Sequence, residues 1–454
     1  MRKRWPDMLI LAGLLALPTL LYWPVLFGGR TLIPADNLFT FQPWRAFAPQ
    51  FGTSTPHNSL LSDLILENYV WKRFILESLR AGQPPLWNPY LFAGVPFLAA
   101  GQHSALYPFS LIFYIFPLWW AYGAFAASQV FLAGAFMYLF LRVLGVGRLG
   151  ATLGAMTYAL SGFMLVSVVF PMIVAGAAWL PLILACIELA LRQQPALGGR
   201  PTRLPWVAAG AVALGCQVLA GHIEITLYTL MVAAAYAAWR LVRRTGDGGR
   251  TTPAPTLVPR LSSVAAIMVL GLGLGAIQLV PLFDVVQSNF RQGAATFEQI
   301  QGWAYPARHI AAFLVPNIFG NPAHHTYVDL FTGRVMPAPP NPLVGGEPTI
   351  WWGIKNYVEG GAYVGILPLL LAVIAVLSWL HQRGQRRRRT GLVYVLHRDR
   401  YDPAPVPFFA ILALVALAFA FGTPLYRLIF WLPGVNQLHS PFRWVWPYTL
   451  AVAV

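Results

Sequence analysis

A carboxylate, Asp36, follows the first apolar stretch of the chain, in the segment GGRTLIPADNLFTFQPW. A carboxylate just above a membrane surface can act as a general base, taking the proton from an acceptor hydroxyl while a phosphate departs from a lipid-linked sugar. The alternative is structural, because Asp in the tripeptide ADN is also a good helix N-cap. Asp36 is the first candidate catalytic residue.

A second carboxylate, Asp63, opens the segment SDLILENYVWKRFILESLRAG. It is a candidate for the same chemistry, although an N-cap is the preferred interpretation because Asp before an apolar run is typical of a helix start. The spacing predicts an amphipathic helix that lies in the membrane interface. Its apolar positions are Leu64, Tyr69, Val70, Phe74 and Leu79, opposite Glu67, Lys72 and Arg80.

The next segment, GQPPLWNPYLFAGVPFLAAGQHSALYP, is dense in Pro, Gly, aromatic residues and amides. Such a composition excludes a helix and predicts a rigid loop lined by aromatic rings. Trp87 and Tyr90 could stack on a sugar face, with Asn88, Gln102 and His103 as hydrogen-bonding groups. An aromatic belt at the membrane interface is the alternative interpretation.

Two ionisable residues, His222 and Glu224, fall between two apolar runs in LGCQVLAGHIEITLY. Ionisable groups at the edge of a membrane are candidates for function. The pair could bind a divalent metal or hold a phosphate, but two ligands do not complete a metal site. A polar turn is the alternative, and the sequence leaves the requirement for a metal undecided.

Several cations lie near the ends of apolar runs on the same side of the membrane as these residues. Each could bind a polyprenyl phosphate through charge-assisted hydrogen bonds. The alternative for each is contact with lipid headgroups. These cations are Arg291, Arg308, His309, Lys355 and Arg443.

The elements that must position these residues are membrane spans. The 454 residues are 57% hydrophobic and 10% charged, against about 25% charged residues in a soluble domain. Runs near the roughly 20 residues that cross a bilayer recur along the chain. We predict an all-α polytopic membrane protein, a single domain over 1–454, with spans near 8–27, 121–142, 149–169, 172–191, 204–221, 223–241, 261–283, 361–380 and 407–427, and an incomplete tenth span from Trp444.

Charge distribution predicts the topology. Most of the 31 Lys and Arg residues fall in the short connections on one side, which the positive-inside rule makes cytoplasmic together with the amino terminus. The net charge of +16 then reflects basic residues on the cytoplasmic side of the membrane, and a nucleic-acid partner is not needed to explain it. Two long segments, the first outer loop 28–105 and a second at about 284–360, then lie outside the cell and are expected to carry the function.

Together these segments resemble the YfhO family of bacterial membrane proteins, which is grouped with the GT-C-type glycosyltransferases. The pieces that carry the resemblance are Asp36 with the following QPW, the Asp63 helix, GQPPLWNPYLFAGVP with AGQHSALYP, AGHIE, GLGLGAIQLVPLFDVVQS, FLVPNIFG, YVEGGAYVGILPLLLA, GTPLYRLIFWLPG and SPFRW. Family members are longer than this chain, so the resemblance also implies that the last span is cut short.

The resemblance implies a GT-C-like helical bundle in the bacterial cytoplasmic membrane, with interfacial helices in its large first outer loop. It further implies transfer of a sugar, with inversion, from a polyprenyl-phosphate-linked donor to a cell-envelope polymer, glycolipid or protein. Asp36 matches the acidic position of that family, and a bound metal is not required. The competing interpretations are a transporter or flippase for lipid-linked sugars, which would place its substrate near the midplane, and a non-enzymatic protein of envelope assembly.

Overall fold

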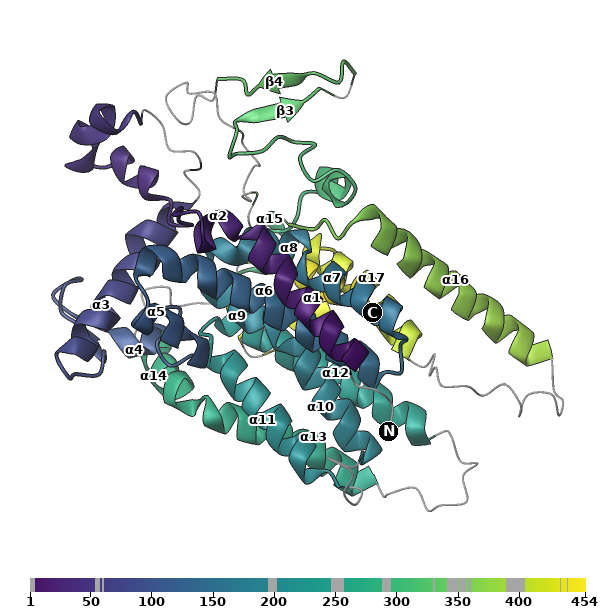
Figure 1. Ribbon diagram of the computed structural model, residues 1–454. Coiled ribbons are helices and arrows are strands. Elements are labelled where there is room, and N and C mark those ends of the chain that lie inside the picture. Colours follow the sequence, from purple (N-terminus) through teal and green to yellow (C-terminus); the bar gives the residue numbers. More distant parts are fainter. Residues whose placement is uncertain are drawn as a thin grey trace.

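The computed structural model describes residues 5–53, 58, 61–194, 202–245, 257–287, 295–329, 331–340, 350, 357, 361–388, 405–432, 434–438 and 440–454. Nearly all of the regular structure is helical, gathered in a bundle with a long helix, α16, along one side (Figure 1). The helices of ten or more residues are α1 (Trp5–Leu21), α3 (Tyr69–Arg80), α6 (Leu118–Val143), α7 (Arg148–Ala159), α10 (Leu180–Arg192), α11 (Leu204–Leu219), α12 (Ile223–Thr245), α13 (Leu257–Leu274), α14 (Ala276–Gln287), α16 (Ile366–Arg388) and α17 (Pro405–Ala420).

Shorter elements connect and extend these helices. They are α2 (Trp23–Leu26), the 3-10 helix η1 (Ala35–Thr40), the π-helix η4 (Leu64–Asn68), α5 (Leu111–Ile115), α8 (Gly162–Val166), α9 (Pro171–Ala178), α15 (Phe297–Gly302) and α19 (Val445–Ala453). Two small antiparallel hairpins complete the fold. One pairs β1 (Trp87–Asn88) with β2 (Val95–Pro96), and the other pairs β3 (Thr326–Val328) with β4 (Val335–Pro337).

The predicted all-α membrane protein is confirmed at this level. Within the described residues four helical segments are long and apolar enough to cross a membrane, namely α6, Pro171–Arg192, Ile223–Arg243 and α13, and two bent pairs bring the number to six. Every predicted span falls on helix, but several are shorter or broken. The predicted span 261–283, for example, is divided at Gly275 into α13 and α14.

Glycines allow a close approach between α11 and α13. A Cβ atom added to Gly271 would lie 2.6 Å from Cβ of Leu214, and one added to Gly275 would lie 2.4 Å from Cγ1 of Val218. Small residues at such positions let helix backbones pack tightly in a membrane, where the hydrophobic effect does little to hold helices together. The glycine-rich run at the end of α13 is therefore a packing surface.

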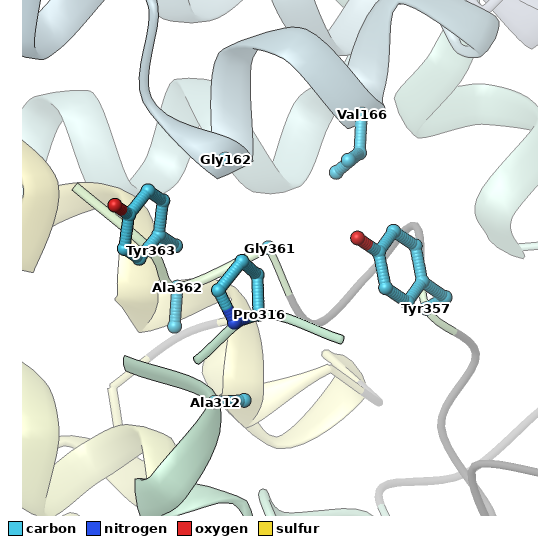
Figure 2. A pocket seen from close by; sticks show the side chains of 8 residues that line it. All are labelled: Gly162, Val166, Ala312, Pro316, Tyr357, Gly361, Ala362 and Tyr363. Atoms are coloured by element: carbon cyan, nitrogen blue, oxygen red, sulfur yellow. The ribbon is translucent and has the colours of Figure 1, made fainter. Parts of the chain in front are cut away.

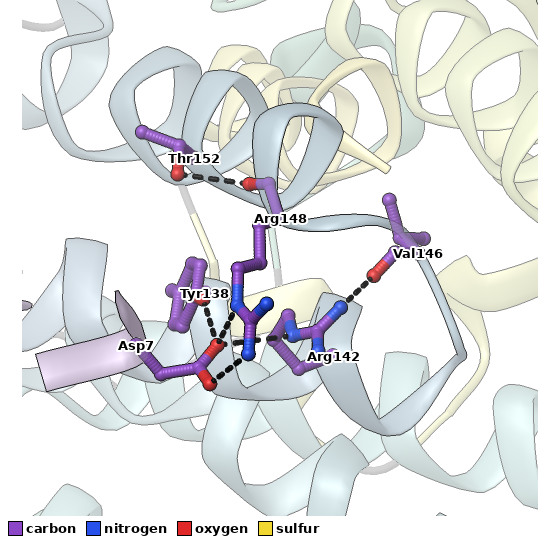
Figure 3. Close-up of polar contacts among 6 residues, drawn as sticks. All are labelled: Asp7, Tyr138, Arg142, Val146, Arg148 and Thr152. Atoms are coloured by element: carbon purple, nitrogen blue, oxygen red, sulfur yellow. Dashed lines mark hydrogen bonds and ion pairs between the residues drawn. The ribbon is translucent and has the colours of Figure 1, made fainter. Parts of the chain in front are cut away.

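One end of the bundle, which we term the arginine-rich end, holds several ion pairs. Asp7 of α1 accepts hydrogen bonds from Arg148 Nη2 at 2.9 Å, Arg148 Nε at 3.1 Å and the Tyr138 hydroxyl at 2.5 Å, while Arg142 lies at 3.5 Å (Figure 3). These contacts fasten α1 to α6 and to the start of α7. Arginines that the sequence assigns to one side of the membrane thus meet at one end of the bundle.

The same end also contains a buried acid, Glu188 of α10. Its carboxylate accepts hydrogen bonds from Arg240, at 2.6 and 2.8 Å, and from the Tyr236 hydroxyl at 2.9 Å, and it also pairs with Arg192. Burial of a charge in a membrane protein is costly unless the charge is paired. Glu188 therefore neutralises two arginines where α10 and α12 meet.

The predicted interfacial helix is helical, as η4 and α3, but its polar face was assigned wrongly. Lys72 was expected on the polar face, yet only 1% of its surface is exposed, whereas Val70, expected on the apolar face, is 49% exposed. The reason is tertiary: the turn at 103–105 and the ring of Phe113 cover the side of α3 that carries Lys72. Sequence spacing alone cannot reveal that covering.

Candidate functional site

A cavity of about 210 Å³ lies between segments that are far apart in the sequence. Its lining residues come from η4, from Gln102, from the start of α9, from the turn before α12 and from Arg443. Four residues predicted from the sequence line it: Asp63, Gln102, His222 and Arg443. The opening turn of α9 supplies apolar walls through Phe170, Pro171, Met172 and Ile173.

The acidic side of the cavity is formed by Asp63 and Glu67. Asp63 immediately precedes the π-helix η4, and Glu67 lies within it. Residues four positions apart lie on the same side of a helix, and π-helical turns often mark functional sites. Burial, and then the charge of Asp63, raise the pKa of Glu67 above its usual value. The expected N-cap role of Asp63 is wrong, because its side chain makes no capping hydrogen bond.

Asn68, which the sequence analysis missed, lines the cavity next to these carboxylates. The Tyr122 hydroxyl donates to Asn68 Oδ1 at 2.9 Å. The Asn68 side chain is 5% exposed. Because its carbonyl oxygen accepts from Tyr122, its NH2 group is the part that remains available to a ligand. The four-residue spacing from Asp63 to Glu67 was the available signal, because residues four positions apart lie on the same side of a helix.

The basic side of the cavity is formed by His222 and Arg443. Arg443 pairs with Glu224, and its Nη1 lies 3.5 Å from His222 Nε2. The Tyr228 hydroxyl donates to Glu224 Oε1 at 2.8 Å. Glu224 therefore orients Arg443 without lining the cavity itself.

The protonation of His222 follows from its surroundings. Burial, and then the charge of Arg443, hold the pKa of His222 well below its usual range, so that the ring is neutral at pH 7. Its Nδ1 accepts the backbone N–H of Ile225 at 3.3 Å. Both ring nitrogens therefore face N–H donors, and Arg443, beside the neutral ring, presents its guanidinium to the cavity, an arrangement that suits an anionic oxygen.

The turn at 101–105 is clamped between α3 and the 220–222 turn. Lys72 Nζ donates to the carbonyl of His103 at 2.6 Å, and Ser104 Oγ donates to the carbonyl of Ala220 at 2.7 Å. Gly221 has φ +91°, and a Cβ atom there would lie 2.0 Å from the carbonyl oxygen of Gly101. The backbone beside Gln102 is thus fixed against the backbone beside His222.

His103 belongs to this clamp. Its Nε2 lies 2.9 Å from the carbonyl of Phe97, its Nδ1 accepts the N–H of Ala105 at 3.0 Å, and the side chain is buried. Burial, and then the charge of Lys72, lower the pKa of His103 to about 4. The predicted hydrogen-bonding residue therefore bonds to the backbone and does not line the cavity.

The remaining predicted residues lie away from the cavity or outside the described residues. Asp36 is half-buried in η1, 3.5 Å from Nδ2 of Asn37, and does not line the cavity. Trp87 and Tyr90 are exposed on the β1–β2 hairpin, and the buried Asn88 accepts the N–H of Tyr90 at 3.0 Å. Arg291 and Lys355 are outside the residues that the structure describes.

A second, smaller cavity of about 30 Å³ lies where the 361–363 segment crosses α8 (Figure 2). Its walls include Gly162, Val166, Tyr357 and Tyr363, and the N–H of Gly162 donates to the carbonyl of Tyr363 at 2.7 Å. The volume is that of about one water molecule. It is too small for a sugar, so the larger cavity is the candidate site.

Metal ligands are not clustered in the described part of the chain, where no group of three or more His, Cys, Asp or Glu side chains could hold an ion. The chain was also compared with known proteins. No family model, no curated protein and no solved structure matches it.

Proposed function

We propose that this protein transfers a sugar from a polyprenyl-phosphate-linked donor to a cell-envelope acceptor, and that the larger cavity is its active site. The observation that carries the proposal is the division of the cavity into an acidic side, Asp63 and Glu67, and a basic side, His222 and Arg443. Glycosyl transfer from a phosphate needs both: a base for the acceptor and cations for the leaving group. The resemblance to the YfhO family supports the same chemistry.

In the proposed mechanism Asp63 removes the proton from the acceptor hydroxyl. The acceptor oxygen then forms a bond to the anomeric carbon while the bond from that carbon to the phosphate oxygen breaks, which inverts the anomeric centre. The negative charge that develops on the leaving phosphate is stabilised by Arg443, which lies beside the neutral ring of His222. Asn68 can donate from its amide to a sugar hydroxyl.

Asp36 is the competing base. It is carried by η1, which packs against η4, the element that directly follows Asp63 and carries Glu67. Asp63 is preferred because a base must lie within hydrogen-bonding reach of the proton it removes, and Asp63 lines the cavity.

The experiment is a transfer assay with the purified full chain in lipid bilayers, given polyprenyl-phosphate-linked sugars and envelope acceptors. The proposal expects a product with an inverted anomeric configuration. A transporter would place its substrate near the midplane between repeats, whereas this cavity is at the opposite end of α10 and α12 from Glu188 and its arginines. Movement of the donor across the bilayer without any transfer would refute the enzyme and support the transporter.

A further inference from the structure

Two arginines at the arginine-rich end lie near each other without an acidic partner among the residues that the structure describes. Arg203 immediately precedes α11, and Arg260 is in the first turn of α13. The Nε atoms of both are buried and have no hydrogen-bond partner within the described structure. Only 8% of the surface of Arg260 is exposed.

The two side chains affect each other electrostatically. Burial, and then the positive charge of Arg260, lower the pKa of Arg203 from its usual value. Like charges so close together and so poorly solvated destabilise the protein unless an anion compensates them.

Other arginines at the same end have such an anion within the chain. Arg192 and Arg240 share Glu188, and Arg148 pairs with Asp7. The ion pairs formed by the described residues do not include Arg203 or Arg260. Among the described residues no carboxylate pairs with these two charges, and an anion from outside the chain would compensate them.

The helices add to the positive potential at this point. The chain leaves the arginine-rich end in α11, returns in α12 and leaves again in α13, so α11 and α13 run parallel and both begin beside these arginines. Helices of 16 and 18 residues carry a partial positive charge at their N-termini, which attracts phosphate groups.

We propose that Arg203 and Arg260 form a binding site for a phosphate group at the arginine-rich end of the α11–α13 pair. The positive-inside rule makes this end cytoplasmic, where basic pockets between membrane helices bind the headgroups of anionic lipids. A free phosphate ion has the same chemistry as a headgroup phosphate. The site is separate from the cavity proposed for catalysis and does not depend on that function.

The test uses the purified full chain in phosphatidylcholine nanodiscs and phosphate-free buffer. Phosphatidylglycerol is added in one arm and inorganic phosphate in the other, and native mass spectrometry and thermal unfolding report binding. We expect Arg260→Gln and Arg203→Gln each to weaken retention of the anion by about tenfold or more, the effect of one charge-assisted hydrogen bond. Arg243→Gln is the matched control, because Arg243 is exposed, with its guanidinium 4.6 Å from the ring of Trp239.

The two arms identify the source of the phosphate. Protection by phosphatidylglycerol alone supports a lipid headgroup, and protection by inorganic phosphate as well supports a soluble anion at the same site. In phosphatidylcholine alone, Arg260→Gln should be at least as stable as the unmodified protein, because an uncompensated charge is removed. The proposal is overturned if each anion raises the unfolding temperature of Arg260→Gln as much as that of the unmodified protein. It is also overturned if Arg260→Gln is less stable than the unmodified protein when no anion is present.

Discussion

Asp63 and Asp36 compete for the role of catalytic base, and amide substitutions separate them. Asp63→Asn keeps the shape of the side chain but cannot accept a proton, so turnover should fall by about 10²–10⁴-fold. Asp36→Asn is the matched comparison and should retain most of its activity, because Asp36 does not line the cavity. Rates with saturating donor and acceptor measure the effect. The opposite pattern, with loss of activity only in Asp36→Asn, would identify Asp36 as the catalytic base.

Lys72 makes stability depend on pH. Burial lowers the pKa of Lys72 from 10.5 to about 7. At pH values between these two pKa values, the lysine is protonated in the unfolded chain but not in the folded protein. Stability should therefore rise as the pH is raised from 7 towards 10. Lys72→Met should flatten this rise in the unfolding temperature, because the titrating group is gone.

Arg73→Met is the control for that experiment. Arg73 is the exposed neighbour of Lys72 and forms an i,i+4 pair with Glu77 at 3.1 Å. Exposed pairs contribute little to stability, so the rise with pH should persist in this variant. An equally steep rise in Lys72→Met would show that another group is responsible.

Single residues of the site were partly predictable from the sequence. Asp63, Gln102, His222 and Arg443 were recognised as polar or charged residues at the ends of apolar runs, and all four line one cavity. Their meeting could not be predicted, because Arg443 and His222 are 221 residues apart in the chain. Glu67 and Lys72 were both placed on the polar face of one helix, yet the structure exposes the first and buries the second.

At the scale of elements, the contact between α11 and α13 depends on individual glycines. Gly271→Val should lower the unfolding temperature by an amount that corresponds to roughly 1–3 kcal/mol, the usual effect of overpacking, because Leu214 occupies the space that the new side chain needs. Gly273→Val is the control, since an added Cβ there meets nothing within 4 Å. Thermal unfolding in nanodiscs distinguishes the two variants. Equal shifts would mean that helix propensity, and not contact with α11, is what matters.

Apolar runs predicted where the helices lie but not where they break. The run at 261–283 is predominantly apolar and predicts one span, yet the helix stops at Leu274 and begins again at Ala276. Similarly, α7 and the segment Gly162–Val169 are bent by 41° with respect to each other. Hydrophobicity measures the preference for lipid, whereas a bend depends on which neighbour a helix must contact, as Gly162 contacts the backbone of Gly361.

For the whole molecule, the distribution of arginines predicts the topology in the membrane. A cysteine introduced at Ser54 or Gly345 should react with a membrane-impermeant thiol reagent in intact cells, and one at Gly248 should not. The native Cys186 and Cys216 lie within α10 and α11. They should first be replaced by Ala to remove background labelling. Labelling at Gly248 alone would invert the predicted topology and place the two long segments, 28–105 and about 284–360, inside the cell.

The ion pairs of Asp7 also determine when the molecule can finish assembling. The first helix leaves the ribosome early, but Tyr138 and Arg148, which bind its carboxylate, follow 131 and 141 residues later. Until they are synthesised, Asp7 must remain at the aqueous edge of the bilayer, because an unpaired carboxylate is costly in lipid. The final docking of α1 is therefore a late event in biosynthesis, completed only after α6 and the start of α7 have been inserted.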